Sequence, residues 1–261
     1  FPHVFGQGRG GFDMVLGNPP WEHVELKEEE FFAARAPSIA KARNAAERKK
    51  AIAALKTSAP TLFEEFQAAQ RLADSEMYLI RASSRFPLCS RGRINTYAIF
   101  AELNRELIND RGSVGCILPA GIAMDDTTKL FFSGLVKTQS LAALFHFENE
   151  DRIFPTVHHA FRFVLLVISG KARKTTAAQF VAFARQVPDI QDPARAYTLS
   201  SEDFTLINPN TGTFPAFRRA RDADLTRTVH HRVSVLIRET REEFPEINPW
   251  NISFRQGIFN M

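Results

Sequence analysis

The sequence predicts an α/β domain with a doubly wound, mostly parallel sheet and a helical insertion. Apolar segments of strand length recur along the chain, at residues 12–16, 113–119, 140–147, 161–169 and 178–184. Segments with helical periodicity, residues 95–109 and 129–138, precede two of these strands. Between residues 24 and 85 the composition shifts to Ala, Glu, Lys and Arg, which favours helix. Buried strands that alternate with helices are typical of a parallel sheet with both faces covered.

A rigid polar segment follows the first predicted strand. Phe12 to Leu16 has the pattern of a buried strand, and Gly17 ends it. The two prolines after Asn18 remove two backbone N–H groups and fix φ, so this segment is extended and stiff. The amide of Asn18, the free carbonyl groups and the indole ring of Trp21 are therefore held in a fixed relation. Such a set can accept hydrogen bonds from an amino group and stack on the flat ring that carries it.

These residues resemble the catalytic motif of a known enzyme family. Asn18 to Trp21 resembles the (Asn/Asp/Ser)-Pro-Pro-(Tyr/Phe/Trp) motif of the methyltransferases that modify the exocyclic nitrogen of adenine in DNA. The longer stretch Gly10 to Glu22 reads Gly-Gly-Phe-Asp-x-x-x-Gly-Asn-Pro-Pro-Trp-Glu and is far more specific. It resembles the large single-chain restriction-modification methylases, including Type IIG enzymes and phage-defence (BREX) relatives.

The resemblance implies a fold, a cofactor and roles for the motif residues. The fold is the C-terminal part of a class I, Rossmann-like methyltransferase that uses S-adenosylmethionine. The side-chain oxygen of Asn18 and the carbonyl of Pro19 would accept the two N6 hydrogens of an adenine extruded from duplex DNA. Trp21 would stack on that base, and Pro20 completes the catalytic set. The ordinary alternative is a loop after a strand with a packed tryptophan.

A second stretch, Arg152 to His158, carries a Phe-Pro pair before a later apolar strand. It resembles the segment of these methylases whose aromatic ring supports the flipped adenine. Phe154 is the first candidate for this role and Phe161 the second, although an aromatic residue before a strand can equally belong to the core. The neighbouring pair His158 and His159 is predicted to point to opposite sides of an extended segment, so no metal site is expected there.

The chain divides into four predicted regions. Residues 1–24 form the catalytic strand and the motif, 25–93 a helical insertion, 94–185 the remaining methyltransferase core, and 186–261 an exit segment toward a target-recognition region. Pro37 and Pro60 are expected to divide the insertion into three helices, the second over residues 38–56 and the third over 61–85. Thr61 and Glu64 have the spacing of a capping box for the third helix.

The exit segment contains one clear helical pattern, residues 220–243, and a basic cluster at its start. Arg218, Arg219 and Arg221 are candidates for contacts with DNA phosphates, which position a duplex without reading its sequence. Solvent-exposed arginines with no ligand are the alternative. The formal net charge of +4 does not by itself indicate a polyanion partner.

Composition gives weaker constraints on the environment of the protein. Cys89 and Cys116 lack metal-ligand spacing and are expected to be buried or idle thiols. No run of about 18 apolar residues is present, so no membrane span is expected and a cytoplasmic location is favoured.

The resemblance covers only the middle of the family's pattern. The glycine-rich turn that binds the methionine end of the cofactor and the acidic residue that holds the ribose are expected before Phe1. The sequence therefore predicts a fragment that is inactive alone, from a protein that methylates adenine N6. The resemblance leaves open whether that protein also carries a fused nuclease. The alternatives are a catalytically dead module that binds DNA or a partner, modification of cytosine N4, and modification of a protein glutamine by the related Asn-Pro-Pro-Tyr enzymes.

Overall fold

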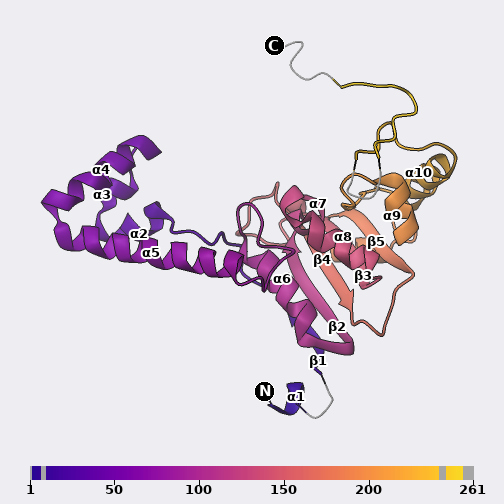
Figure 1. Ribbon diagram of the computed structural model, residues 1–261, viewed down its shortest axis with the longest axis horizontal. Helices are drawn as coiled ribbons and strands as arrows, with labels where there is room; N and C mark the ends of the chain where they lie inside the picture. Colours follow the sequence, from indigo (N-terminus) through magenta and orange to yellow (C-terminus); the bar gives the residue numbers. More distant parts are fainter. Residues whose placement is uncertain (1, 7–9, 241–244, 255–261) are drawn as a thin grey trace.

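The computed structural model describes residues 2–6, 10–240 and 245–254. A six-stranded sheet forms the centre of the body, and a helical arm projects from one side of it (Figure 1). The strand order is β1-β2-β4-β3-β5-β6. The strands span Phe12–Gly17 (β1), Ile108–Pro119 (β2), Leu141–Glu148 (β3), Arg162–Ser169 (β4), Ala177–Ala184 (β5) and Tyr197–Ser200 (β6).

The α/β class is confirmed, and four of the six strands share one direction. β1 is parallel to β2, and β3 is parallel to β5, whereas β4 runs antiparallel between β2 and β3 and β6 runs antiparallel to β5. The predicted alternation of strand and helix holds only as far as β3. From β3 to β4 and from β4 to β5 the chain returns through loops and a short 3₁₀ turn, because an antiparallel neighbour needs no helical crossover.

The helices of the body pack on one face of the sheet. Side chains from α6, α8 and α9, including Tyr97, Phe132 and Phe204, join alternate strand residues in the main core. The opposite face carries a smaller cluster that is covered by loops. On β1 this face is open, because Met14 and Leu16 are 62% and 73% exposed. Among the described residues, the expected second layer of helices is therefore not formed. The body helices are Thr96–Leu107 (α6), Gly121–Met124 (α7), Lys129–Lys137 (α8), Ser201–Ile207 (α9) and Ala220–Arg232 (α10).

Residues 25–93, here called the arm, form four helices around a small core of their own (Figure 1). The predicted helix over residues 38–56 is interrupted, because Asn44 is extended and its side chain accepts the N–H of Glu47 at the start of a new helix. The predicted cap Thr61 is also wrong. Pro60 occupies the first turn, where its fixed φ suits the helix, and Ala59 precedes it without a side-chain cap. The helices are Glu28–Arg35 (α2), Pro37–Ala40 (α3), Ala45–Ser58 (α4) and Pro60–Ala82 (α5).

The arm joins the body through a loop that a buried carboxylate holds. Glu102 of α6 accepts the backbone N–H groups of Leu88 and Cys89 at 3.1 and 2.9 Å. Burial raises the pKa of the Glu102 carboxyl, while the two N–H groups oppose that shift. The root of the arm is therefore tied to the first turns of a core helix.

Residues beyond 185 do not simply leave the body. β6 extends the sheet, and Tyr197, Leu199, Phe204 and Phe214 are buried in the main core. The capping box of Ser200 and Asp203 starts α9 directly after β6, a signal that the sequence analysis missed. The helix predicted over residues 220–243 ends at Arg232, where Val233 is extended, and residues 241–244 lie outside the described part of the chain.

None of the described helices is long and apolar enough to cross a membrane.

Candidate active site

The Asn-Pro-Pro-Trp loop, Asn18 to Trp21, begins where β1 ends, at one edge of the sheet. Gly17 pairs in parallel register with Cys116 of β2, so the loop leaves the sheet beside the last residues of β2. β4 runs the opposite way, so its first residues lie at this same edge. The carboxyl ends of parallel strands are where α/β folds place their ligands, and the loop occupies such a position.

Thr96, the first residue of α6, anchors the far side of the loop. Its hydroxyl donates to the carbonyl of Pro20 at 2.7 Å, and its backbone N–H donates to the carbonyl of Glu22 at 2.8 Å. The backbone N–H of Glu22 in turn donates to the Thr96 hydroxyl at 3.2 Å. His23 adds an antiparallel bridge to Asn95. The loop is thus fixed at both ends, and the role of Thr96 was not foreseen from the sequence, although a Thr at a helix start is a common anchor.

Two hydrogen-bond acceptors of the loop have no partner among the described residues. Asn18 is exposed, and among the described residues its side chain has no hydrogen-bond partner within the protein. The carbonyl of Pro19 likewise accepts no hydrogen bond from the described residues, although the ring of Pro19 is buried. Thr96 donates to the carbonyls of Pro20 and Glu22 and to neither of these two oxygens, which lie on adjacent residues of a stiff segment.

The ring of Trp21 contacts both aromatic candidates. The ring of Phe161 is nearly parallel to Trp21, with an interplanar angle of 15° and centroids 6.2 Å apart. Phe154 meets Trp21 edge to face at 5.9 Å and also packs on Phe163 at 4.9 Å. Phe161 is 47% exposed, whereas Phe154 is part of the smaller core. The indole N–H of Trp21 is buried and has no partner in the described part of the chain.

Asn149 organises the segment that carries both phenylalanines. Its side chain is fully buried and accepts the N–H of Phe154 at 2.9 Å, while its amide donates to the carbonyls of Phe154 and Val157 at 3.0 and 3.1 Å. Its backbone N–H donates to the carbonyl of Phe161 at 3.1 Å. Sequence reasoning missed Asn149; a polar residue directly after an apolar strand was the available signal.

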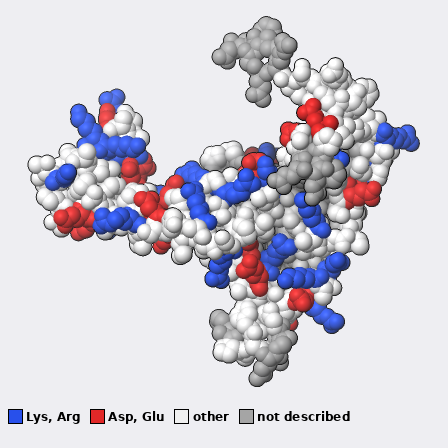
Figure 2. Space-filling view, in the orientation of Figure 1, with Lys and Arg blue, Asp and Glu red and all other residues white. Residues whose placement is uncertain are grey.

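The basic candidates separate in the structure. Arg218 reaches the carboxyl-end edge of the sheet, where its guanidinium lies 4.3 Å from the centre of the Phe183 ring. Arg219 and Arg221 are exposed at the start of α10 without a comparable contact. Figure 2 shows that Lys and Arg side chains form several separate groups over the arm and the body, with acidic residues between them. The small net charge therefore arises from separate basic and acidic groups on the surface.

The paired histidines differ from expectation. The rings of His158 and His159 lie 4.5 Å apart, because this segment is a turn and not an extended strand. His159 also pairs with Glu150 at 3.1 Å, so an acidic neighbour that the sequence analysis had not expected is present. Within the described ranges, no group of three potential metal ligands assembles. Both cysteines are buried, as predicted, and burial raises the pKa of each thiol.

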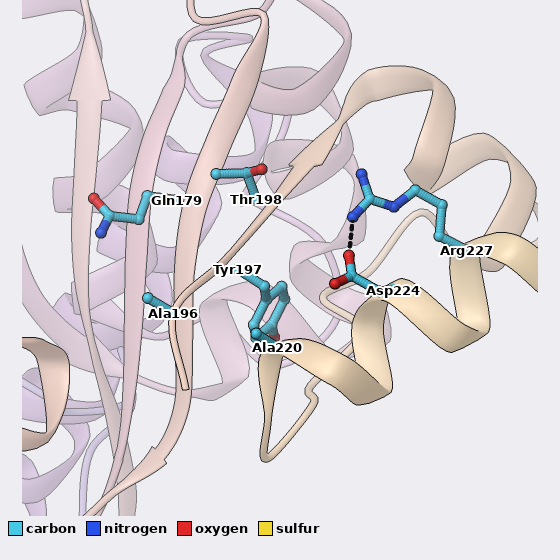
Figure 3. Close-up of a pocket in the computed structure, with 7 residues that line it drawn as sticks. All are labelled: Gln179, Ala196, Tyr197, Thr198, Ala220, Asp224 and Arg227. Carbon is cyan, nitrogen blue, oxygen red and sulfur yellow. Dashed lines mark hydrogen bonds and ion pairs between the residues drawn. The ribbon is translucent and has the colours of Figure 1, made fainter. Parts of the chain in front are cut away.

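Two cavities lie away from the Asn-Pro-Pro-Trp loop. One of about 350 Å³ lies between β5, β6 and α10. Figure 3 shows Gln179 on one side of the view, the ion pair of Asp224 and Arg227 on the other, and Tyr197 between them. The other, of about 1000 Å³, lies between α8, α9 and the loop at Asn208. Neither of these two cavities is lined by residues of the Asn-Pro-Pro-Trp loop.

Comparison with known proteins finds similar solved structures but no matching family model and no matching curated protein. One similar structure is the type IIG restriction endonuclease BpuSI, with 16% identity, 73% of this chain covered and a TM-score of 0.42. A modification subunit of a putative type I restriction enzyme from Vibrio vulnificus has 10% identity, covers 78% of this chain and gives a TM-score of 0.42. The Type ISP restriction-modification enzyme LlaBIII has 10% identity, covers 69% of this chain and gives a TM-score of 0.36. This chain spans only 19%, 37% and 11% of the lengths of those three chains.

Proposed function

We propose that the protein transfers a methyl group from S-adenosylmethionine to N6 of an adenine extruded from duplex DNA, within a restriction-modification or phage-defence protein. One observation carries the proposal: the uncommitted oxygens of Asn18 and Pro19 are adjacent on a rigid loop at the carboxyl end of β1. The resemblance of Gly10 to Glu22 to the adenine methylases supports the same assignment.

The two oxygens supply what the acceptor nitrogen lacks. The lone pair of adenine N6 is delocalised into the ring, so the amino group is a poor nucleophile. Hydrogen bonds from its two hydrogens to Asn18 and Pro19 favour a pyramidal nitrogen, whose lone pair is then available for bond formation. Because the acceptors are already positioned, little reorganisation is needed at the moment of reaction.

Aromatic stacking holds the base in this position. The rings of Trp21 and Phe161 are nearly parallel, with an interplanar angle of 15° and centroids 6.2 Å apart, so this pair offers aromatic faces on which a planar base can stack after a ring movement. Phe161 suits this role better than Phe154, because Phe154 is committed to Phe163 and to Asn149.

In this proposal, the described residues bind the base that receives the methyl group. No Gly-x-Gly turn follows a strand in residues 2–6, 10–240 and 245–254, so these residues do not form a glycine-rich cradle for the cofactor. When bound, S-adenosylmethionine supplies an electrophilic methyl group. We expect the 261-residue chain alone to bind the cofactor weakly and to be inactive. Calorimetry tests this expectation, and micromolar affinity would contradict it.

Replacement of Asn18 in the complete protein tests the catalytic assignment. Asn18→Ala removes one positioned acceptor and should lower methylation by about 10²- to 10³-fold, the usual effect of losing one such group. Asn18→Asp keeps an oxygen acceptor and should retain more activity. The readout is N6-methyladenine in digested DNA, with thermal unfolding as the control for folding.

Three outcomes would contradict this proposal. Undiminished methylation by Asn18→Ala would exclude the catalytic role of this residue. Methylation of cytosine N4 alone would change the substrate. Binding of DNA without any methylation by the unmodified protein would favour a catalytically dead module.

A further inference from the structure

Three arginines that are far apart in the sequence surround one buried carboxylate. Glu148, the last residue of β3, has a side chain that is only 9% exposed. Its oxygens lie 3.8 Å from Arg162 at the start of β4, 3.5 Å from Arg185 after β5, and 4.0 Å from Arg218 before α10. The three arginine side chains are each more than half exposed. These four residues are called the arginine cluster below.

Only one of the three guanidinium groups donates a hydrogen bond to Glu148. Arg185 donates from Nε to Oε2, whereas Arg162 and Arg218 both approach Oε1 without a hydrogen bond. Because both terminal nitrogens lie near the same oxygen, the two groups are close enough to bind one phosphate together. Three positive charges meet one negative charge, so the cluster has an excess of two.

In the described part of the chain, the neighbouring carboxylates of Asp189 and Asp151 form no ion pair with Arg162 or Arg218. Asp189 accepts the backbone N–H groups of Arg185 and Gln186, and it also pairs with Arg195. Asp151 accepts from the side chain of Gln186. These contacts hold the loop after β5 in place and leave the guanidinium groups of Arg162 and Arg218 facing solvent.

A buried histidine helps to position Arg218. Phe183 adopts φ 59°, a left-handed conformation inside a strand, and its N–H donates to Nδ1 of His146 at 3.1 Å. The ring of Phe183 then lies under the guanidinium of Arg218 at 4.3 Å. A strained backbone conformation that a fully buried side chain maintains is typical of functional positions.

The cluster lies on the same edge of the sheet as Asn18. β4 and β3 are the second and third strands from β1, and β5 is the fourth. At a spacing of about 4.8 Å per strand, the arginines lie roughly 10 to 20 Å from the Asn-Pro-Pro-Trp loop. One contact connects the two places: Trp21 of the loop stacks on Phe161, which directly precedes Arg162. At about 3.4 Å per nucleotide, this distance corresponds to roughly three to six nucleotides.

We propose that Arg162 and Arg218 bind backbone phosphate of duplex DNA a few nucleotides from the extruded base, while Glu148 and Arg185 hold them in position. Guanidinium groups match the geometry of phosphate oxygens and remain charged at every relevant pH. This inference rests on the proposed function, because it assigns the DNA contacts that would place a nucleotide at Trp21.

Duplex binding by single-charge variants tests the inference. Arg162→Gln and Arg218→Gln, in the complete protein, should each weaken binding of a fluorescent 20-base-pair duplex, measured by anisotropy between about 50 and 200 mM salt. Loss of one phosphate contact reduces the slope of log affinity against log salt by about 0.9. Because Arg162 and Arg218 share one phosphate, the double variant should lose this contact fully, whereas each single variant should lose only part of it. Arg71→Gln, the same charge change on the exposed surface of α5, is the matched control and should leave the slope unchanged.

Several results would overturn the inference. The inference fails if the salt slope is unchanged in both cluster variants, or if Arg71→Gln reduces the slope as much as they do. It also fails if the unmodified protein does not bind the duplex. An effect on RNA of the same sequence that exceeds the effect on DNA would overturn the choice of DNA. Arg162 and Arg218 are exposed, so we expect both variants to fold, which circular dichroism would check.

Glu148→Gln separates positioning from simple charge. Removal of a negative charge should strengthen DNA binding if Glu148 only competes with phosphate. If Glu148 positions the two guanidinium groups, binding should instead weaken although the protein gains positive charge. Tighter binding would overturn the positioning role. Because no binding measurement depends on methylation, a cluster that binds DNA in a protein without methyltransferase activity would contradict the proposed function alone.

Discussion

The arm and the body of this protein are held together by different kinds of contact. The core of the arm consists of five buried residues, all between Phe32 and Phe66. The main core of the body joins residues from Tyr97 to Ala223, together with Cys89 at the root of the arm, and includes strands that are neighbours in space but not in sequence. Every residue of the candidate site belongs to the body, where strand ends from distant parts of the chain meet.

The connection between the two regions is narrow. Along α5, between the arm core and the body, Leu72, Tyr78 and Leu79 are 63%, 73% and 66% exposed. Few buried apolar contacts therefore couple the arm to the sheet, and regions coupled in this way can unfold separately. Local contacts make the arm a self-contained unit, whereas the geometry of the site depends on the whole body.

Replacement of one buried phenylalanine in each region gives the largest expected effect. Phe131 in α8 and Phe32 in α2 are both fully buried, so each change to Ala should cost about 3–5 kcal/mol. Phe131→Ala should lower the free energy of global unfolding. Phe32→Ala should remove protection from hydrogen exchange in α2 to α4 while the strands stay protected. Loss of protection in both regions by either variant would show that they unfold as one unit.

Acid should weaken the body before the arm. Burial, helped by the charge of Arg162, lowers the pKa of His146 from 6.5 to about 4. The unfolded chain therefore takes up a proton near pH 6.5 that the folded body does not. Stability should fall by about 3 kcal/mol as the pH falls from 6.5 to 4, and it should be unaffected by this group above that range. The arm contains no histidine and should keep its protection.

Hydrogen exchange at several pH values measures this difference. His146→Gln should flatten the pH dependence of body stability, although it also removes a buried ring. A pH dependence that remains the same in this variant would assign the effect to other groups.

A smaller contrast separates the two aromatic candidates within the body. Phe161→Ala should change the unfolding temperature little, because the ring is 47% exposed, but should weaken binding of a duplex with an extruded base by about 1–3 kcal/mol. Phe154→Ala should mainly destabilise the body, because this ring packs on Trp21 and Phe163. If Phe154→Ala mainly weakened binding and Phe161→Ala mainly lowered stability, Phe154 would be the residue that stacks on the base and Phe161 the residue of the core.

Local sequence patterns predicted most of the elements. The strand before Asn18, the helical insertion, the helix at residues 95–109 and the later apolar strands were found from periodicity, glycine and proline. The errors arose where a nearby side chain changed the local preference. Asn44 starts a new helix inside a predicted one, and the capping box at Ser200 starts a helix in a segment that looked irregular.

By itself, the sequence determined the stiff Asn-Pro-Pro-Trp loop at the end of a strand, because proline geometry and the apolar run are local properties. Only the tertiary structure decided the antiparallel place of β4, the one-sided packing of the helices and the gathering of Arg162, Arg185 and Arg218 around Glu148. Strand order depends on contacts between segments that are distant in the chain, and no local pattern encodes which strand end will lie beside Asn18.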